Sequence, residues 1–385
     1  MTVTEDIRYI GVDDHDTTLF ESQYPLERGV SYNSYLILSK GESLVMDTVE
    51  KDFVQEWLGN IGRENGGKSP DYLVVQHMEP DHSSGIAAFM EKYPEAKIIS
   101  SQKAFTMMKN FFGTDYSERR IVIADGDSFT LGEHTLTFVA APMVHWPEVM
   151  VTYDSFDKVL FSADGFGTFT ANDLRRDDED WAGEARRYYI GIVGKYGTMV
   201  QNLLKKASAL DIRMICPLHG PVLKDNLSCY IDLYDKWSSY TPEDDGITVC
   251  YTSVYGHTKE AALRLAEMLE KKGRTVEVYD LARSDVYEAV ASAFRHSTLV
   301  LATTTYDGDI FPAMRGFIER LTHRFYQKRR IALIENGSWG PVAARIMKGM
   351  FEKSKDITFS ENTVTIMSAL NEKSQEALEK LAEEL

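Results

Sequence analysis

The sequence predicts two α/β domains, the first a sandwich of sheets and helices and the second a doubly wound parallel sheet. Its 385 residues exceed what one hydrophobic core usually organises. Apolar, strand-like runs alternate with helical segments in both halves of the chain. Between the halves, residues 238–246 concentrate Ser, Pro, Asp and Gly without periodic apolar positions, as linkers do. We therefore expect domains over residues 1–245 and 246–385.

Elements of the first domain follow from short apolar runs bounded by polar turns. Residues 31–47 predict two strands around the turn Lys40-Gly41. Further strands are expected over residues 72–76, 96–100, 121–124, 135–140, 149–153 and 158–163, with helices over 84–92 and 101–112. This alternation favours an α/β sandwich with polar loops at the strand ends.

The second domain shows a more regular alternation. Strands are expected over residues 247–251, 275–280, 298–302, 331–335 and 363–367, and helices starting near Thr258, Ser284, Phe311, Val342 and Asn371. Five strands with five crossover helices predict a doubly wound parallel sheet.

Composition excludes several classes of function. The net charge of −17 is spread along the chain, which argues against nucleic acid or an anionic membrane as the partner. Without a leader-like start or a membrane-length apolar run, we expect a cytoplasmic protein. The three cysteines, Cys216, Cys229 and Cys250, form no C-x-x-C pair, so we expect core packing rather than a disulfide framework or a cysteine-bound metal.

A dense group of potential metal ligands follows the strand expected at residues 72–76. His77, Glu79, Asp81 and His82 fall within six consecutive positions, and a loop can turn such side chains toward one point. Three further candidates, each after an apolar run, are His145, Asp164 and His219. Four histidines and three carboxylates exceed what a structural zinc needs and suit two metals with a carboxylate between them. These nitrogen and oxygen ligands fit iron, manganese or zinc.

Any one of these residues alone is more often structural, because isolated histidines usually satisfy hydrogen bonds and an Asp-Gly pair usually marks a turn. His15, His134, His296 and His323 lie outside any comparable cluster and are expected to be ordinary core or surface residues. Tyr188, Tyr189 and Tyr196 could reach the metals as proton donors, but aromatic residues at helical spacing are more often packing.

A phosphate loop is expected after the first strand of the second domain. Hydroxyl groups of Ser253 and Thr258 can surround one phosphate, Gly256 permits a tight turn, and a helix N-terminus adds a favourable dipole. The loop comprises Ser253, Val254, Tyr255, Gly256, His257 and Thr258. It has neither a dinucleotide nor a Walker pattern, so a single phosphate, as in FMN, is favoured. Capping alone explains many such loops.

Two more loops support a flavin. They follow the third and fourth strands, at the carboxyl edge where doubly wound sheets bind ligands. The first contains Thr303, Thr304, Thr305, Tyr306, Asp307 and Gly308, and the second Asn336, Gly337, Ser338, Trp339 and Gly340. Tyr306 and Trp339 are the expected ring-stacking residues.

Together these motifs make the chain resemble the flavodiiron proteins over nearly its whole length. H-x-E-x-D-H, His145 after 62 intervening residues and Asp164 after 18 more are similar to the diiron pattern of that family. The resemblance implies a metallo-β-lactamase-like αββα sandwich followed by a flavodoxin-like domain. It also implies that His77, Glu79 and His145 hold one iron, that Asp81, His82 and His219 hold the other, and that Asp164 bridges them, with no catalytic residue beyond these ligands.

One spacing and one residue depart from the family pattern. Only 54 residues separate Asp164 from His219, fewer than the family has, and Leu218 stands where a small Ser is common. We expect the missing residues to shorten a helix or loop between Thr170 and Asp211, close to the substrate.

The resemblance further implies reduction of O2 to water, of NO to N2O, or both. FMN would relay electrons from an external donor such as rubredoxin, a flavin or NAD(P)H reductase, or a reduced deazaflavin. A head-to-tail homodimer, or a dimer of such dimers, is also implied. The cysteine count argues against a fused rubredoxin-like module.

Two alternatives remain open at this stage. One is a dinuclear zinc hydrolase of the β-lactamase fold with a flavodoxin-like electron-transfer domain. Glu79 weighs against it, because zinc hydrolases of that fold usually have histidine there and a harder anionic ligand favours iron. The other is a flavodoxin-type electron carrier whose first domain only docks a partner.

Overall fold

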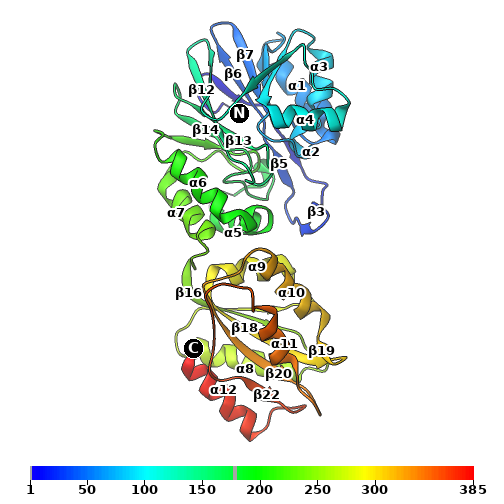
Figure 1. Ribbon diagram of the computed structural model, residues 1–385, viewed down its shortest axis with the longest axis vertical. Coiled ribbons are helices and arrows are strands. Elements are labelled where there is room, and N and C mark those ends of the chain that lie inside the picture. Colours follow the sequence, from blue (N-terminus) through cyan, green and yellow to red (C-terminus); the bar gives the residue numbers. More distant parts are fainter. Residues whose placement is uncertain (1, 177–179) are drawn as a thin grey trace. The chain divides into compact units, whose positions relative to one another are not determined.

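The computed structural model describes residues 2–176 and 180–385 and divides into two compact units, Met1–Asp235 and Lys236–Leu385 (Figure 1). The connecting stretch is shorter than the linker expected from the sequence. Helix α7 (Leu227–Ser238) ends at the first residue of the expected linker, and strand β16 (Asp244–Tyr251) includes the last three residues of that linker. Ion pairs of Asp244 with His296 and Arg295 stabilise this early strand start.

The first unit contains two mixed sheets. One has the order β1-β6-β7-β8-β9-β10, and the other has the order β11-β12-β13-β14-β15. The first sheet comprises β1 (Ile7–Tyr9), β6 (Tyr35–Ser39), β7 (Glu42–Met46), β8 (Tyr72–Val74), β9 (Lys97–Ser101) and β10 (Arg120–Ile123). The second comprises β11 (Ser128–Leu131), β12 (His134–Ala140), β13 (Met150–Asp154), β14 (Val159–Phe161) and β15 (Met214–Cys216). Two ribbons pair β2 (Val12–Asp14) with β5 (Val30–Tyr32), and β3 (Leu19–Phe20) with β4 (Tyr24–Pro25).

Helices flank both sheets of this unit. Figure 1 shows α1, α3 and α4 beside the first sheet and α5 to α7 near the second. Their bounds are α1 (Val54–Glu64), α2 (Pro80–Ser83), α3 (Ile86–Lys92), α4 (Gln102–Phe112), α5 (Trp181–Tyr188) and α6 (Gly197–Ala207). Four short segments accompany them: η1 (Lys51–Phe53), η2 (Asn172–Leu174), η3 (Tyr189–Val193) and η4 (Gly194–Tyr196). The Ser101 hydroxyl caps α4 by accepting the Ala104 N–H, and Gly113 ends the helix with φ +75°.

The core of the first unit lies between its two sheets. Ile37, Leu44 and Val74 of the first sheet pack in one cluster with Phe138 and Phe161 of the second, and all five side chains are fully buried. Because alternate residues of a strand point to opposite faces, this packing leaves the outer faces for the helices. The sandwich expected from the sequence is confirmed.

The strands expected in the first unit are present, with bounds shifted by a few residues. The turn between β6 and β7 falls at Lys40-Gly41, where both residues have positive φ, as tight hairpins require. The short strands β1, β11 and β15 were not anticipated. The metal loop also differs from expectation, since Asp81 and His82 lie on the short helix α2.

The second unit contains a sheet whose main path is parallel, with the order β17-β16-β18-β20-β21, and the two-residue β19 (Asp309–Ile310) pairs antiparallel with β18. The remaining strands are β17 (Val276–Asp280), β18 (His296–Tyr306), β20 (Arg329–Asn336), β21 (Ile357–Phe359) and β22 (Val364–Ile366). The last strand expected from the sequence is present as β22, which pairs with the end of β20, and an additional strand, β21, pairs with the start of β20. Only β22 was anticipated. From β16 the chain continues to β17 on one side and β18 on the other, so the strand order reverses there.

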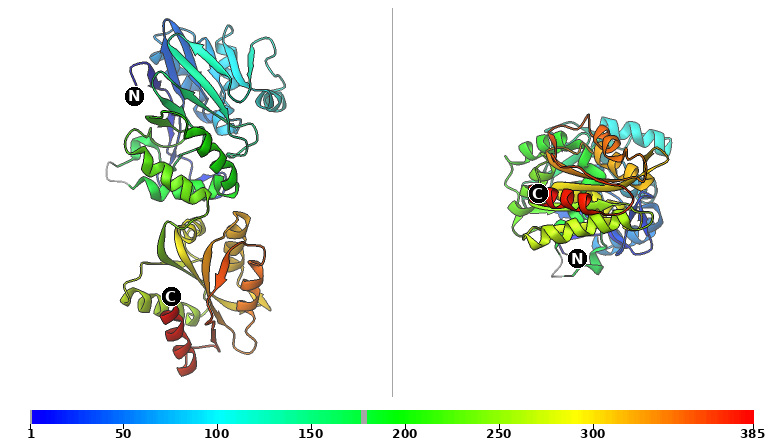
Figure 2. Two further views of the ribbon diagram at one scale, coloured as in Figure 1. Left: turned by 60° about the vertical axis from the view of Figure 1, so that its left-hand side comes forward. Right: turned by 90° about the horizontal axis from the view of Figure 1, so that it is seen from below.

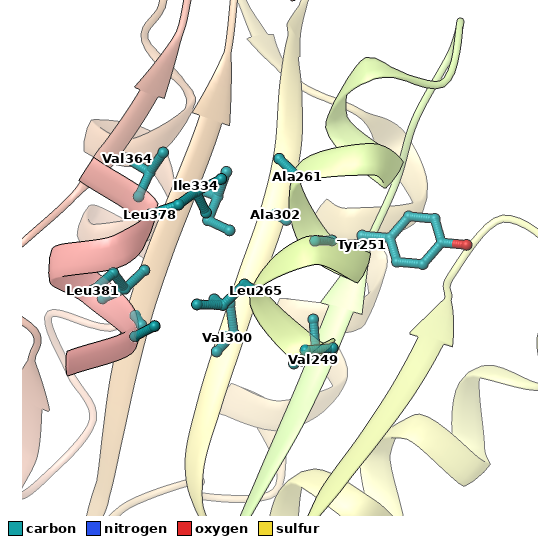
Figure 3. Close-up of a cluster of buried hydrophobic side chains, with 14 of the residues drawn as sticks. Val249, Tyr251, Ala261, Leu265, Val300, Ala302, Ile334, Val364, Leu378 and Leu381 are labelled. Carbon is teal, nitrogen blue, oxygen red and sulfur yellow. The ribbon is translucent and has the colours of Figure 1, made fainter. Parts of the chain in front are cut away.

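Five helices cover this sheet: α8 (His257–Lys271), α9 (Val286–Arg295), α10 (Pro312–His323), α11 (Ala343–Met350) and α12 (Glu372–Glu384). The right-hand view of Figure 2 shows α8 and α12 on one face, with the orange α11 on the other. Figure 3 shows how Leu265 of α8 and Leu381 of α12 pack against Val300 and Ile334 of the sheet. These contacts cover one face of the sheet, and with α11 on the other face the doubly wound arrangement is confirmed.

Among the described residues, no helix is both long and apolar enough to cross a lipid bilayer. The three cysteines are unpaired. Cys216 and Cys250 are buried as expected, but Cys229 is exposed on α7, so core packing does not explain it.

Candidate metal centre and flavin loops

The seven predicted metal ligands lie at the ends of strands in both sheets of the first unit. His77 and Glu79 follow β8, and Asp81 and His82 begin the adjoining helix α2. The other three, His145, Asp164 and His219, follow β12, β14 and β15. Short polar connections after apolar strands thus bring residues from 77 to 219 to one end of the sandwich.

His77, Glu79 and His145 form the first group. Nε2 of His77 lies 3.2 Å from Oε2 of Glu79, and Nε2 of His145 lies 2.9 Å from the same oxygen. Two ligand atoms each about 2.1 Å from one ion are roughly 3.0–3.4 Å apart in octahedral or tetrahedral geometry. The spacing of this group therefore matches the ligand set of one metal.

Asp81, His82 and His219 form the second group. Oδ2 of Asp81 lies 3.3 Å from Nε2 of both histidines, and the two Nε2 atoms are 3.0 Å apart. Two imidazole nitrogens that face each other at this distance repel when both present lone pairs, unless a proton or a cation lies between them. A shared metal removes this conflict.

Asp164 lies between the two groups. Its Oδ2 is 3.2 Å from Nε2 of His77 and 3.1 Å from Nε2 of His145, while its Oδ1 is 3.4 Å from Nε2 of His82. The residue is 1% exposed, yet neither carboxylate oxygen has a hydrogen-bond partner. A buried carboxylate without hydrogen bonds is costly. The chemistry of this ligand set fits two metals that share one carboxylate.

The charges of the site favour cations. Burial raises the pKa of Asp164, but His77, His145 and His82 outweigh that effect and hold the pKa well below its usual range. Burial alone would lower the pKa of His145, yet Asp164 and Glu79 raise it to about 9. Ionised carboxylates thus attract positive charge into the pocket, and a bound metal would take the place of the protons on the histidines.

Two contacts fix the orientation of the imidazoles. Nδ1 of His77 lies 3.0 Å from Oε1 of Glu148, and the same oxygen accepts the Met78 N–H at 2.8 Å. Nδ1 of His219 donates to the Ser31 carbonyl at 2.8 Å. Each histidine therefore turns its Nε2 lone pair toward the metals. Sequence reasoning missed Glu148, although its place after Trp146-Pro147 in the loop of His145 was a usable signal; nothing in the sequence marks the Ser31 carbonyl.

The predicted flavin loops meet at one edge of the parallel sheet. In the strand register, Tyr251 of β16 lies beside Ala302 of β18, and Thr304 lies beside Asn336 of β20, which in turn lies beside Ile366 of β22. The three loops that follow these strands are therefore neighbours. A fourth loop was missed: Ser368 follows β22, and its carbonyl accepts the Asn336 amide at 3.0 Å.

The first of these loops turns at Gly256, whose φ of +100° lies in the region that favours glycine, and α8 begins at His257. The Ser253 hydroxyl accepts the Gly256 N–H at 3.1 Å. Thr258, 3% exposed, accepts a hydrogen bond from the Asn336 amide at 3.3 Å. Two hydroxyls at the N-terminus of a 15-residue helix fit a phosphate.

Aromatic side chains project from the same loops. Trp339 is 94% exposed, Tyr255 is 91% exposed and Tyr306 is 44% exposed. Exposed aromatic rings gathered on neighbouring loops often mark a ligand site, because a bound ligand can cover their apolar faces. A flat ring system such as the isoalloxazine of FMN fits against them.

Comparison with known proteins agrees with this geometry. A family model described as "ODP family beta lactamase" matches residues 30–220. The fold is similar to rubredoxin oxygen:oxidoreductase of Desulfovibrio gigas, with a TM-score of 0.92 and 23% identity, over 100% of this chain and 97% of that one. The flavodiiron protein of Giardia intestinalis has a TM-score of 0.90 and 24% identity, over 99% of this chain and 95% of that one.

Curated relatives extend the likeness to sequence. The anaerobic nitric oxide reductase flavorubredoxin of Vibrio vulnificus is 29% identical over 348 residues, which cover 88% of this chain and 70% of that protein. The protein of the same name from Escherichia coli O1:K1 / APEC is 29% identical over 372 residues, which cover 94% of this chain and 77% of that protein. The chain belongs to the flavodiiron proteins.

In this flavodiiron protein, aromatic rings surround the second ligand group. The ring centroids of Tyr188, Phe20 and Tyr32 lie 5.4, 5.5 and 5.8 Å from that of His219. Tyr188 is fully buried, and burial followed by the charges of Asp164 and Asp81 raises the pKa of its phenol well above the usual value. The packing role expected of the three tyrosines thus holds for Tyr188, but beside the metal ligands.

The structure shows the surroundings of the two departures from the family pattern, Leu218 and the short segment between Asp164 and His219. Leu218 is buried, and its backbone donates to the Ala163 carbonyl at 2.9 Å and accepts the Asn33 N–H at 2.8 Å. The first bond ties the loop of His219 to that of Asp164, and the second ties it to the segment after β5. The stretch between Thr170 and Asp211 forms η2, α5, η3, η4 and α6, and part of it, 177–179, lies outside the described residues.

An apolar cavity of about 250 Å³ adjoins the loops of two ligands. Its lining includes Val144, Val151, Leu160, Phe166, Leu204 and Ile215. Val144 precedes His145, and Phe166 stacks on Tyr234 with ring centroids 4.1 Å apart, two residues after Asp164. The space beside these two ligand loops is therefore lined mainly by hydrocarbon.

Proposed function

We propose that this flavodiiron protein reduces dioxygen to water, nitric oxide to nitrous oxide, or both, with electrons that an external donor supplies through FMN. The position of Asp164 carries the proposal, because its two oxygens face two separate ligand groups. In this proposal residues 1–245 carry the metals and residues 246–385 carry the flavin. His77, Glu79 and His145 hold one iron, Asp81, His82 and His219 hold the other, and Asp164 bridges them.

When bound, two ferrous ions and a reduced FMN supply four electrons, which is what reduction of one dioxygen to two waters consumes. The chain's own residues position these groups. Glu148 and the Ser31 carbonyl hold His77 and His219 with Nε2 directed inward. Glu79 and Asp81, whose side chains are 15% and 12% exposed, mark the accessible side of the site. The apolar cavity that adjoins the loops of His145 and Asp164 suits small uncharged substrates better than the polar substrates of hydrolases.

For the flavin, Ser253, Gly256 and Thr258 supply the phosphate loop at the start of α8. Tyr306 and Trp339 supply flat surfaces for the ring, and the backbones of their loops supply hydrogen bonds to its edge. The full set comprises residues 253–258, 303–308 and 336–340. Support comes from the common sheet edge at which these loops meet and from the exposure of Trp339.

A dinuclear zinc hydrolase with an electron-transfer domain is the weaker alternative. Glu79 brings a second carboxylate to the first ligand group, which suits an iron that changes its oxidation state. A hydrolase would also leave the convergent loops of the second unit without a use.

The partners form part of the same proposal. The donor is a rubredoxin, a flavin or NAD(P)H reductase, or a reduced deazaflavin; the names of the Desulfovibrio and Vibrio relatives support the first. The cytoplasmic location and the head-to-tail homodimer, alone or paired, stay predictions.

The deciding experiment measures iron, zinc and FMN per chain in protein purified without oxygen, followed by gas consumption with a chemically reduced flavin as donor. About two irons and one FMN, with turnover of O2 or NO, would support the proposal. About two zincs that iron cannot replace, with no gas consumption, would favour the hydrolase.

A further inference from the structure

A third group of potential metal ligands lies in the first unit, outside the flavodiiron centre. It consists of Asp6, His134 and Asp157, each of which offers one ligand atom within 4.8 Å of the others. Asp154 contacts the other nitrogen of the imidazole, with Oδ2 2.7 Å from Nδ1 of His134. We call these four residues the His134 cluster. The sequence alone gave no reason to single out His134, because its partners are scattered from residue 6 to residue 157.

The hydrogen bond to Asp154 determines which nitrogen of His134 faces the cluster. Asp154 and His134 are both fully buried, and the 2.7 Å distance is typical of a charge-assisted bond in which Nδ1–H donates to a carboxylate. Nε2 then points toward the two other carboxylates. It is buried and has no hydrogen-bond partner. This carboxylate–histidine pair has the same form as that of Glu148 and His77 in the diiron centre.

The distance from Nε2 to Asp6 agrees with a shared ion. Nε2 lies 3.4 Å from Oδ2 of Asp6. A direct charge-assisted hydrogen bond is about 2.7–2.9 Å long, whereas two ligands of one tetrahedral ion with bonds of about 2.1 Å lie about 3.4 Å apart.

The balance of charge is also unfavourable without a cation. Across residues 2–176 and 180–385, no lysine or arginine forms an ion pair with Asp6, Asp154 or Asp157. Arg8, the nearest in sequence to Asp6, donates instead to the carbonyls of Thr4 and Ile7. The second unit offers a contrast: His296 also lies between two carboxylates, Asp244 and Glu277, but Arg295 pairs with both of them.

We propose that the His134 cluster binds one divalent cation of the zinc class through Nε2 of His134 and the carboxylates of Asp6 and Asp157. Imidazole with two carboxylates is a ligand set that zinc accepts, and water completes the coordination at Asp6, whose side chain is 34% exposed. Asp154 does not touch the ion. It is a positioning residue that holds the imidazole.

The site would link the two sheets of the sandwich. Asp6 precedes β1 at the edge of the first sheet, while His134 begins β12 and Asp157 lies in the turn between β13 and β14 of the second. One hydrogen bond already joins these parts, from the Thr4 hydroxyl to Oδ2 of Asp157 at 2.5 Å. A cation would add bonds between segments far apart in sequence, so its role is structural.

The test uses full-length protein that contains iron and FMN. The protein is equilibrated with a small excess of zinc chloride, passed through a desalting column, and analysed for zinc, iron and FMN per chain. We expect one zinc in the wild type with iron unchanged, and loss of that zinc in His134→Gln. The matched control His296→Gln, which alters the histidine cluster of the second unit, should keep the zinc.

Asp157→Asn provides a second variant that leaves His134 in place and should also lose the zinc if His134→Gln folds poorly. Anomalous scattering at the zinc edge from crystals of the same protein would place the ion next to Nε2 of His134. No zinc in the wild type would overturn the proposal and leave His134 as a protonated partner of its carboxylates. Equal zinc in the wild type and both variants, or zinc gained only as iron is lost, would overturn it as well.

Discussion

His77 and Glu148 form a fully buried pair, with Nδ1 of the imidazole 3.0 Å from Oε1 of the carboxylate and neither side chain exposed. The contact sets the tautomer of His77 and directs Nε2 at the first metal position. The negative charge of Glu148 also makes His77 a stronger ligand.

Replacing Glu148 by Gln keeps the shape of the side chain but removes its charge. We expect iron to be held about 10–100-fold less tightly, the usual effect of losing such a partner. The measurement is the iron retained after dialysis against graded chelator concentrations. Glu133→Gln, at an exposed position paired only with Lys40, is the matched control. Equal retention in the two variants would show that Glu148 does not support the site.

Replacing Asp164 by Asn tests the bridge directly. An amide offers one oxygen ligand in place of two, so it cannot serve both groups. We expect consumption of O2 and NO to fall below about 1% of the wild-type rate, because both substrates need the paired metals. FMN content should stay the same, because the flavin loops lie in the other unit. Asp225→Asn, an exposed change, should have no effect. Unchanged turnover in the Asp164 variant would contradict the diiron mechanism.

The sequence predicted the parts of this fold and site that rest on long apolar runs. Strands β18 and β20 contain the continuous apolar runs Leu299–Ala302 and Ile331–Ile334, as strands of a covered parallel sheet do, and the polar loops after them mark the flavin edge. His77, Glu79, Asp81 and His82 were recognisable because they crowd six positions. The structure brings them together with His145, Asp164 and His219, which are far away in the sequence and reach the site only through the pairing of strands.

What the sequence could not predict depends on contacts between distant or very short segments. Glu148 acts on His77 from another loop, and Ser31 acts through its backbone carbonyl, which no side-chain pattern reveals. The additional strand β21 of the second unit escaped notice, because it is only three residues long. His134 was judged ordinary for the same reason, since Asp6 and Asp157 reach it only after the two sheets pack.

Replacing Thr258 by Val tests the phosphate loop. The change keeps the volume and the branched shape of the side chain, but it removes the hydroxyl at the start of α8. We expect FMN to bind about tenfold more weakly, since one hydrogen bond to a charged group contributes about 1.5 kcal/mol. Fluorescence titration of the apoprotein with FMN measures this, with Thr358→Val on the edge strand β21 as the control. Undiminished affinity would place the phosphate elsewhere.

The ion-pair cluster of the second unit predicts a pH dependence of stability. Burial alone would lower the pKa of His296, but its contacts with Glu277 and Asp244 raise it above the usual value, and the same contact lowers the pKa of Glu277 to about 2.

A histidine whose pKa is raised in the folded state stabilises the fold fully below its unfolded pKa of about 6.5 and ceases to do so as the pH rises through the folded value. A glutamate whose pKa is lowered stabilises the fold above about 4.5 and loses this effect as the pH falls toward 2. The pair therefore stabilises the fold most between about pH 4.5 and about pH 6.5. We expect the difference in unfolding free energy between the wild type and His296→Gln to shrink by about 1 kcal/mol between pH 6 and pH 9, since the carboxylates are partly screened by solvent.

Urea denaturation of both proteins, each loaded with iron and FMN to the same extent, measures that difference at the two pH values. Glu277→Gln should reduce the pH dependence, because it removes one of the two charges that raise the pKa of His296. A difference between wild type and His296→Gln that stays constant from pH 6 to pH 9 would mean that folding does not raise the pKa of His296, and that Arg295 alone balances the two carboxylates.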